Sequence, residues 1–344
     1  MVERRAPTTE KVVELIAAHE NIPAAHHARY TDGEAGTVAD SKIAAAIRIL
    51  SLSILSGISP DYGGSMNALA EDTDYVYAGG AITWTVRKYL KPTMAYVSES
   101  PDYGGTIYAL AEDTDYIYAG GSGPQTIRKY LKSTMALAGE SPDYGGSIRA
   151  LAEDTDYVYA GGSGPHTVRK YLKSTMAYVS ESPDYGGWIN ALAEDTSYIY
   201  AGGSTTRTVR KYLKSTMDYV SESESYGEDI NALAEDTDYI YAGGYTTRRV
   251  RKYLKSTMAY VLQSPNYGGT IRALAEDTDF IYAGGDTTQT VRKYLKSTMA
   301  YVLQSPNYGA TIRALAKDTD FIYAGGFGPQ TVRKYLLLEI LVPA

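Results

Sequence analysis

A 13-residue segment that begins at Ala68 and ends in Tyr-Ala-Gly-Gly returns, almost unchanged, throughout the chain. Its further copies begin at Ala109, Ala150, Ala191, Ala232, Ala273 and Ala314, so seven copies follow one another at a constant spacing of 41 residues. A period of this size is typical of solenoids and β-propellers, in which each repeat is one supersecondary unit.

The residue pattern inside one period favours the propeller. Residues 65–70, 75–78, 85–90 and 94–99 are short runs with the pattern of strands, and the last three of them contain aromatic and β-branched residues. Clusters of Gly, Asp, Pro and Thr separate these runs and predict turns, and no helical period is present. We therefore expect an all-β, seven-bladed β-propeller of four-stranded antiparallel blades over residues 51–344, preceded by a short α-helical segment over 1–50.

Residues 59–344 resemble the broad group of propellers that contains quinoprotein-like and kelch-like repeats. The Ile-Tyr-Ala-Gly-Gly at 117–121 resembles the kelch di-glycine at the end of a second strand. The downstream kelch tryptophan and the Trp-Asp dipeptide of WD repeats are both missing, so the resemblance implies the architecture and no particular subfamily.

Two segments are candidates for the strand that closes the ring. Residues 53–58 fall where the other units have their fourth strand, while 337–342 follow the third strand of the last unit. An open ring would expose blade faces and strand edges. We expect 53–58 to complete the last blade, with 337–342 as the alternative.

Differences among the copies are concentrated at two sites. One follows the Tyr-Gly-Gly and the other follows the Ala-Gly-Gly, and the antiparallel strand order places both on one face of the disc. Loops on a rigid scaffold commonly carry function, and Trp, Tyr and Arg are enriched at recognition surfaces. The candidate ligand-binding residues are Trp84, Tyr108, Gln125, Arg149, His166, Trp188, Arg207, Asp229, Tyr245, Arg248, Arg272, Gln289, Arg313 and Phe327. The alternative is that these surface loops have simply drifted.

The segment 1–50 shows two amphipathic patterns. Residues 8–19 and 38–50 each place apolar side chains on one stripe, which predicts two short helices that anchor the protein to other particle subunits or join copies of it. The stretch 25–35 is similar to a segment of phage tail and fibre-like structural proteins. We expect no secretory signal, because residues 1–7 are charged, and no run is long enough to span a bilayer.

Composition and motifs argue against several classes of function. A net charge of −7 without a basic patch disfavours nucleic-acid binding, and the absence of cysteine excludes thiolate metal sites. The Glu-Asp-Thr-Asp segments lack the glycine and distal acid of a calcium loop, so we interpret them as tight turns. The recurring tyrosines predict blade packing, and the recurring Arg87-Lys88 pair predicts cross-strand ion pairs. No catalytic or metal-binding motif is recognisable, and we expect no enzyme activity and no cofactor.

Together these features predict a non-enzymatic binding or adhesion protein. The preferred hypothesis is a virion or tail-like particle component whose variable propeller face recognises a glycan or a cell-surface protein. An intracellular interaction scaffold or sensor is the alternative, and a quinone- or metal-dependent enzyme is a third and weaker one.

Overall fold

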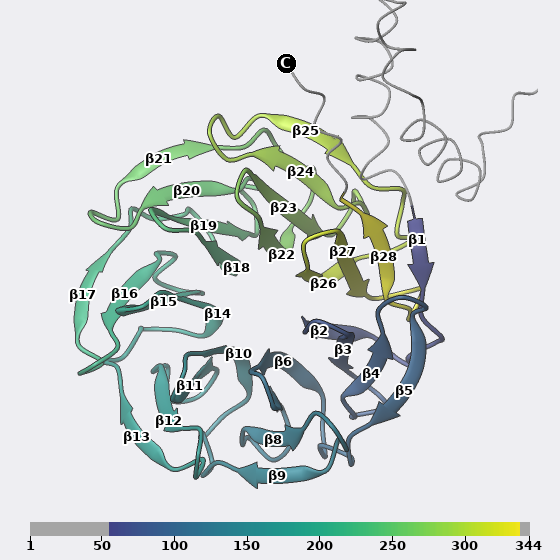
Figure 1. The fold of residues 1–344 in the computed structure, drawn as a ribbon. Coiled ribbons are helices and arrows are strands. Elements are labelled where there is room, and N and C mark those ends of the chain that lie inside the picture. Colours follow the sequence, from purple (N-terminus) through teal and green to yellow (C-terminus); the bar gives the residue numbers. More distant parts are fainter. Residues whose placement is uncertain (1–54, 338–344) are drawn as a thin grey trace, which may run out of the picture.

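The computed structural model describes residues 55–337, which form a ring of seven four-stranded antiparallel sheets (Figure 1). Blades 1 to 6 each take four consecutive strands, from β2–β5 to β22–β25, and blade 7 takes β26, β27, β28 and β1. The predicted seven-bladed propeller is therefore confirmed. The helices predicted within 1–50 lie outside the described residues.

The four strands of each blade follow one another from the centre of the ring to its outer edge. The innermost strands are β2 (Met66–Glu71), β6 (Ile107–Glu112), β10 (Ile148–Glu153), β14 (Ile189–Glu194), β18 (Ile230–Glu235), β22 (Ile271–Glu276) and β26 (Ile312–Lys317). The second strands are β3 (Tyr75–Gly80), β7 (Tyr116–Gly121), β11 (Tyr157–Gly162), β15 (Tyr198–Gly203), β19 (Tyr239–Gly244), β23 (Phe280–Gly285) and β27 (Phe321–Gly326).

The outer half of each blade is built from shorter strands. The third strands are β4 (Arg87–Leu90), β8 (Arg128–Leu131), β12 (Arg169–Leu172), β16 (Arg210–Leu213), β20 (Arg251–Leu254), β24 (Arg292–Leu295) and β28 (Arg333–Leu336). The outermost strands are β5 (Ala95–Glu99), β9 (Leu137–Glu140), β13 (Tyr178–Glu181), β17 (Tyr219–Glu222), β21 (Tyr260–Gln263), β25 (Tyr301–Gln304) and β1 (Leu55–Ile58).

Strand β1 closes the ring, as predicted from the alignment of the repeats. It pairs antiparallel with β28, with Leu55 opposite Tyr335 and Ile58 opposite Arg333. Of the competing segment 337–342, only Leu337 lies within the described residues, where it is buried in the core between blades 6 and 7. A chain whose two ends share one sheet cannot open the ring without breaking that sheet.

The core lies between neighbouring blades rather than within one of them. Tyr77 and Val86 of blade 1, for example, pack with Ile107, Ile117 and Tyr130 of blade 2. The interface between blades 7 and 1 is built in the same way, with Tyr323 and Val332 packed against Val76, Tyr89 and Met66, which stands where the other blades have isoleucine. The joint that closes the ring therefore has an apolar core, as the other joints have.

The first glycine of each Ala-Gly-Gly allows adjacent blades to approach closely. A Cβ atom on Gly120 would lie 2.5 Å from Cγ2 of Ile148 on the next innermost strand. The second glycine, Gly121, pairs with Ile107 at a register shift, and a Cβ there would lie 2.0 Å from the Thr106 carbonyl oxygen. This pairing extends the second strand to residue 121, beyond the end predicted from the sequence.

Lysines of the third strands join each blade to the next. Lys88 Nζ donates to the Lys132 carbonyl at 2.8 Å and lies 3.7 Å from the ring centroid of Tyr75. The final link, from Lys334 to the Lys91 carbonyl at 2.9 Å, closes the circle. The prediction that the Arg-Lys pair forms cross-strand ion pairs is therefore wrong for Lys88, because it points into the blade interface, where burial lowers its pKa.

The Glu-Asp-Thr-Asp segments are tight turns, as predicted, and they also connect blades. Asp72 Oδ1 accepts hydrogen bonds from the backbone amides of Asp74 and Tyr75, while Oδ2 accepts one from the Tyr77 hydroxyl at 2.7 Å. Lys132 of blade 2 forms ion pairs with Asp72, at 3.2 Å, and with Glu112. Burial alone would raise the pKa of Asp72, but these hydrogen bonds and the lysine hold it below its ordinary value.

Replacing Gly120 with alanine should destabilise the propeller. The new methyl group would overlap Ile148, and overpacking of a core costs about 1–3 kcal/mol. Urea unfolding followed by circular dichroism measures the change. The matched control is Gly139→Ser, since three other blades carry serine at this position, as Ser98, Ser180 and Ser221. A midpoint for Gly120→Ala equal to that of the control would contradict the close-approach explanation.

Alkaline pH should unfold the protein through its buried tyrosines. Burial and the Asp72 carboxylate raise the pKa of Tyr77 above its ordinary value, and burial raises that of Tyr89 to about 12. Groups whose folded pKa is raised stabilise the fold below the unfolded value of 10.0 and lose that contribution as the pH rises through the folded pKa. The depressed pKa of Lys88 acts in the opposite direction, but only up to its unfolded value of 10.5.

Between pH 10.5 and about 12, the free energy of unfolding should therefore fall by about 1.4 kcal/mol per pH unit for each tyrosine that ionises only in the unfolded chain, and the urea midpoint should fall with it. The part of the ultraviolet tyrosinate absorbance that comes from the buried tyrosines should rise together with the loss of circular dichroism across the same range. Gradual ionisation of all tyrosines in a chain that stays folded would show that the rings are accessible to solvent.

Candidate functional site

Both variable sites lie on one face of the disc, as predicted. The backbone amide of Ala81, in the hairpin after β3, donates to the Ser65 carbonyl in the connection that leads into β2. The amide of Tyr103, in the next connection, donates to the Trp84 carbonyl at 2.7 Å. We call this side the variable face and the side with the Glu-Asp-Thr-Asp turns the constant face.

The variable hairpins share one unusual backbone conformation. Their last residues are Trp84, Gln125, His166, Arg207, Arg248, Gln289 and Gln330, and all have a positive φ between 52° and 59°. Non-glycine residues rarely adopt this left-handed region. It directs each carbonyl toward the following connection, where it accepts the hydrogen bond from a tyrosine amide. The backbone of the face is thus uniform, while the side chains differ from blade to blade.

Large apolar side chains are exposed on this face. Trp84 and Trp188 are 40% and 48% exposed, and Tyr245 and Phe327 are more than half exposed. Ile82 is exposed to 70% and belongs with them, although the sequence analysis did not select it. Its position inside the variable hairpin was a signal that could have identified it.

The inner part of the face contains two groups of side chains in contact. In the first, the guanidinium carbon of Arg149 lies 4.5 Å from the ring centroid of Trp188 and 5.9 Å from that of Tyr108. These residues come from the innermost region of blades 2, 3 and 4. Arg149 Nε is buried without a hydrogen-bond partner among the described residues, so the guanidinium is held chiefly by the two rings.

The second group spans blades 6, 7 and 1. Arg272 binds both carboxylate oxygens of Asp286, with distances of 2.7 and 2.8 Å. Arg313 donates to Asn67 Oδ1 at 2.8 Å and lies 5.9 Å from the ring of Phe327. Burial and the neighbouring Arg272 lower the pKa of Arg313. The two groups together place three arginines around the variable end of the central opening.

The remaining predicted site residues lie apart from these groups. His166 is 4.0 Å from Asp184, and Arg207 is 3.5 Å from Glu228. Gln125, Gln289 and Asp229 are half-buried, and Tyr245 and Arg248 are exposed in the blade 5 hairpin. The predicted residues therefore share a face, but only some of them form contacts with one another.

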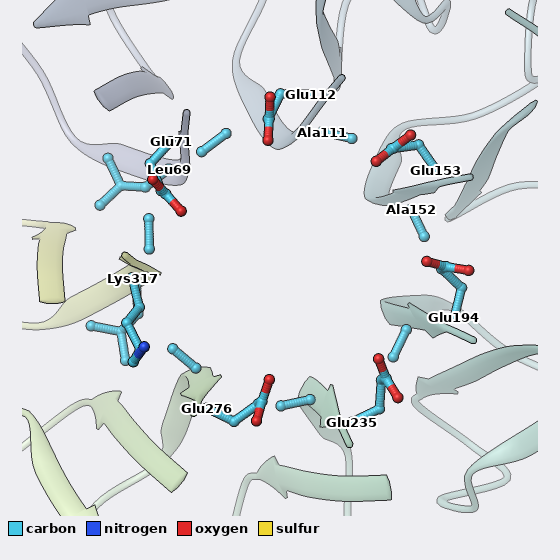
Figure 2. A pocket seen from close by; sticks show the side chains of 16 residues that line it. Leu69, Glu71, Ala111, Glu112, Ala152, Glu153, Glu194, Glu235, Glu276 and Lys317 are labelled. Carbon is cyan, nitrogen blue, oxygen red and sulfur yellow. The ribbon is translucent and has the colours of Figure 1, made fainter. Parts of the chain in front are cut away.

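The opposite end of the central opening is acidic and was not singled out from the sequence. A hollow of about 470 Å³ is lined by alanines and by Glu71, Glu112, Glu153, Glu194, Glu235, Glu276 and Lys317 (Figure 2). Each glutamate forms an ion pair with a lysine, as Glu71 does with Lys91. Lys317 stands where the seventh glutamate would be, and Leu337 where its lysine would be.

Within residues 55–337, no group of three or more His, Asp or Glu side chains has the geometry to hold a metal ion. Over the same residues, no helix is long and apolar enough to cross a membrane.

A scan of protein-family models finds no match to this chain, and a search of curated proteins also finds none. Solved structures are similar in fold. The WD40 β-propeller domain of Doa1 superposes with a TM-score of 0.73 at 12% identity, covering 84% of this chain and 98% of that one. The computationally designed Ika8 protein superposes with a TM-score of 0.66 at 14% identity, covering 82% and 99%. At these identities the likeness shows a shared propeller fold, and the resemblance to kelch-like and quinoprotein-like repeats stays a prediction.

Proposed function

We propose that this protein is a non-enzymatic binding protein that holds a macromolecular partner on its variable face. The observation that carries the proposal is the contact group of Tyr108, Arg149 and Trp188, on the same face as the exposed aromatic side chains of other blades. Arginines and tryptophans of this kind supply much of the binding energy at recognition surfaces. Large exposed apolar side chains gathered on one face also indicate an interaction site.

The uniform backbone of the variable face supports the same proposal. Every hairpin has nearly the same φ at its last residue and the same hydrogen bond to the next connection, so side chains of four types are presented from seven matching positions. A rigid scaffold that carries variable side chains keeps the entropy cost of binding low. Drift alone would not explain why both tryptophans of the chain lie at these positions.

The class of partner that we propose is a glycan or a surface protein. Aromatic rings offer flat apolar area, and the adjacent arginines offer hydrogen-bond donors for carboxylates or hydroxyls. We further propose that residues 1–50 join the propeller to a virion or tail-like particle, or to copies of itself, which would add avidity. An intracellular scaffold that binds a protein through the same face is the second candidate. The two groups of contacting side chains are distributed unequally around the ring, which favours a protein surface as its partner.

The test compares two variants on a glycan and surface-protein panel. The first carries Trp84→Gln, Trp188→Ser, Tyr245→Ser and Arg248→Gln, which install residues found at the same positions of other blades, such as Gln125 and Ser204. The matched control carries Asp74→Ser and Asp156→Ser on the constant face, where blade 4 already has Ser197.

We expect the first variant to bind at least about tenfold more weakly than the parent, and the control to bind equally well, because only the first loses the aromatic and arginine contacts. Circular dichroism would verify that both variants stay folded. Binding that survives the four changes, or that the control variant loses, would reject the variable face as the working surface.

A further inference from the structure

The outer rim of the propeller carries an arginine in every blade, and in four blades this arginine binds a carboxylate of the chain itself. In blade 1, Arg87 Nε donates to Glu99 at 2.8 Å, and Thr85 Oγ1 donates to the same carboxylate at 3.1 Å. The equivalent arginines of blades 2, 3 and 4 bind Glu140, Glu181 and Glu222 in the same way. A hollow of about 220 Å³ lies over the blade 1 site, lined by Asp61, Tyr89 and Tyr96 as well.

Blades 5 and 6 keep the arginine and lose the carboxylate. Gln263 and Gln304 stand where the first four blades have glutamate, opposite Arg251 and Arg292 in the strand register. Arg251 Nε and Arg292 Nε are buried without a hydrogen-bond partner among the described residues. The second acid of the groove, Asp61 in blade 1, is also replaced, by Ser225 in blade 5 and Asn266 in blade 6.

In blade 6 the second donor is also left without an acceptor. Thr290, which corresponds to Thr85, is only 5% exposed, and its Oγ1 has no hydrogen-bond partner among the described residues. Blade 5 differs, because Arg249 replaces this threonine and donates to the Ser264 carbonyl. A buried polar group without a hydrogen-bond partner destabilises the fold, and a charged one does so more strongly. Blade 6 therefore holds both donors of the carboxylate site and lacks only the acceptor.

We propose that the rim of blade 6, at the position that corresponds to the blade 1 hollow, is a binding site for a carboxylate, supplied by an acidic side chain of a partner polypeptide. Blade 1 shows the geometry of the occupied site, with the carboxylate between Arg87 and Thr85. In blade 6 the exposed side chain of Gln304 moves aside, and the incoming carboxylate accepts hydrogen bonds from Arg292 Nε and Thr290 Oγ1. A polypeptide suits this place because β25 is the last strand of its sheet within the described residues and can pair with an extended segment.

This site is on the rim, next to the outer edge of the variable face, and it includes none of the residues on which the function proposed above rests. The missing acids of blades 5 and 6 leave their rim less negative than that of blades 1 to 4, which directs an acidic segment to this side of the ring. The proposal therefore does not depend on the function proposed above.

Acetate is the first probe, and the readout is the NMR signal of each arginine Nε–H group in the full-length protein. Titration with sodium acetate, against sodium chloride at equal ionic strength, should shift the Arg292 signal and leave that of Arg87 unchanged, because Glu99 already occupies the blade 1 site. The substitution Arg292→Lys assigns the signal. An Arg292 signal that does not move, or that moves together with that of Arg87, would overturn the proposal.

Two reciprocal substitutions sharpen the test. Gln304→Glu should fill the blade 6 site, raise the unfolding midpoint and abolish the acetate response of Arg292. Glu99→Gln should empty the blade 1 site and give Arg87 an acetate response. Both variants copy a residue that other blades carry at the same position, so both should fold. An acetate response that persists in Gln304→Glu would contradict the assignment.

A blocked peptide with one glutamate among threonines is the second probe, with the glutamine version of the same peptide as control. We expect the glutamate peptide to shift the Arg292 signal at a concentration at least about tenfold lower than acetate does, since strand pairing adds to the charge-assisted hydrogen bonds. Equal responses to the two peptides would reject recognition of a carboxylate.

Discussion

Close approach of neighbouring blades is the constraint on which the rest of this molecule depends. The innermost strands can surround the axis only if each second strand lets the innermost strand of the next blade come against its backbone, and Gly120 and its equivalents provide that room. The buried lysines then connect the blades across the same interfaces through backbone carbonyls and tyrosine rings. Because β1 and β28 complete the last blade, the interface is repeated around the whole circle.

The two faces of the disc differ in the contacts that are repeated from blade to blade. On the constant face, lysines, aspartates and glutamates join adjacent blades, so a change there would disturb an interface between blades. On the variable face, the repeated contacts are made by the backbone, through carbonyls such as that of Trp84, and by the invariant tyrosines of the connections, such as Tyr62. Side chains at the variable positions are therefore free to differ without loss of the fold. This explains in physical terms why the variation is concentrated at the two sites on that face.

Because the blades are near copies of one another, a position in one blade can be compared directly with the equivalent position in the others. The ion pair of Arg87 with Glu99 shows what the rim groove contains when it is complete, and Arg292 with Gln304 shows the same groove without its acid. The central opening contains a comparable departure, where Lys317 and Leu337 replace a glutamate and its lysine. Such differences between copies are visible in the sequence, but their structural effect can be read only when it is known which side chains are in contact.

The sequence by itself determined the architecture. A constant period, four strand patterns in each unit and turn residues at fixed places are local properties, and they were sufficient for the seven blades, the closing strand and the face that varies. Only the tertiary structure decided how side chains from different blades combine. Lys88 was expected to pair with an acid of its own sheet, yet it reaches the next blade, because alternation along a strand does not reveal what lies across an interface. The contacts of Arg149 with Trp188 and the unpartnered donors of blade 6 likewise depend on distances between segments that are remote along the chain.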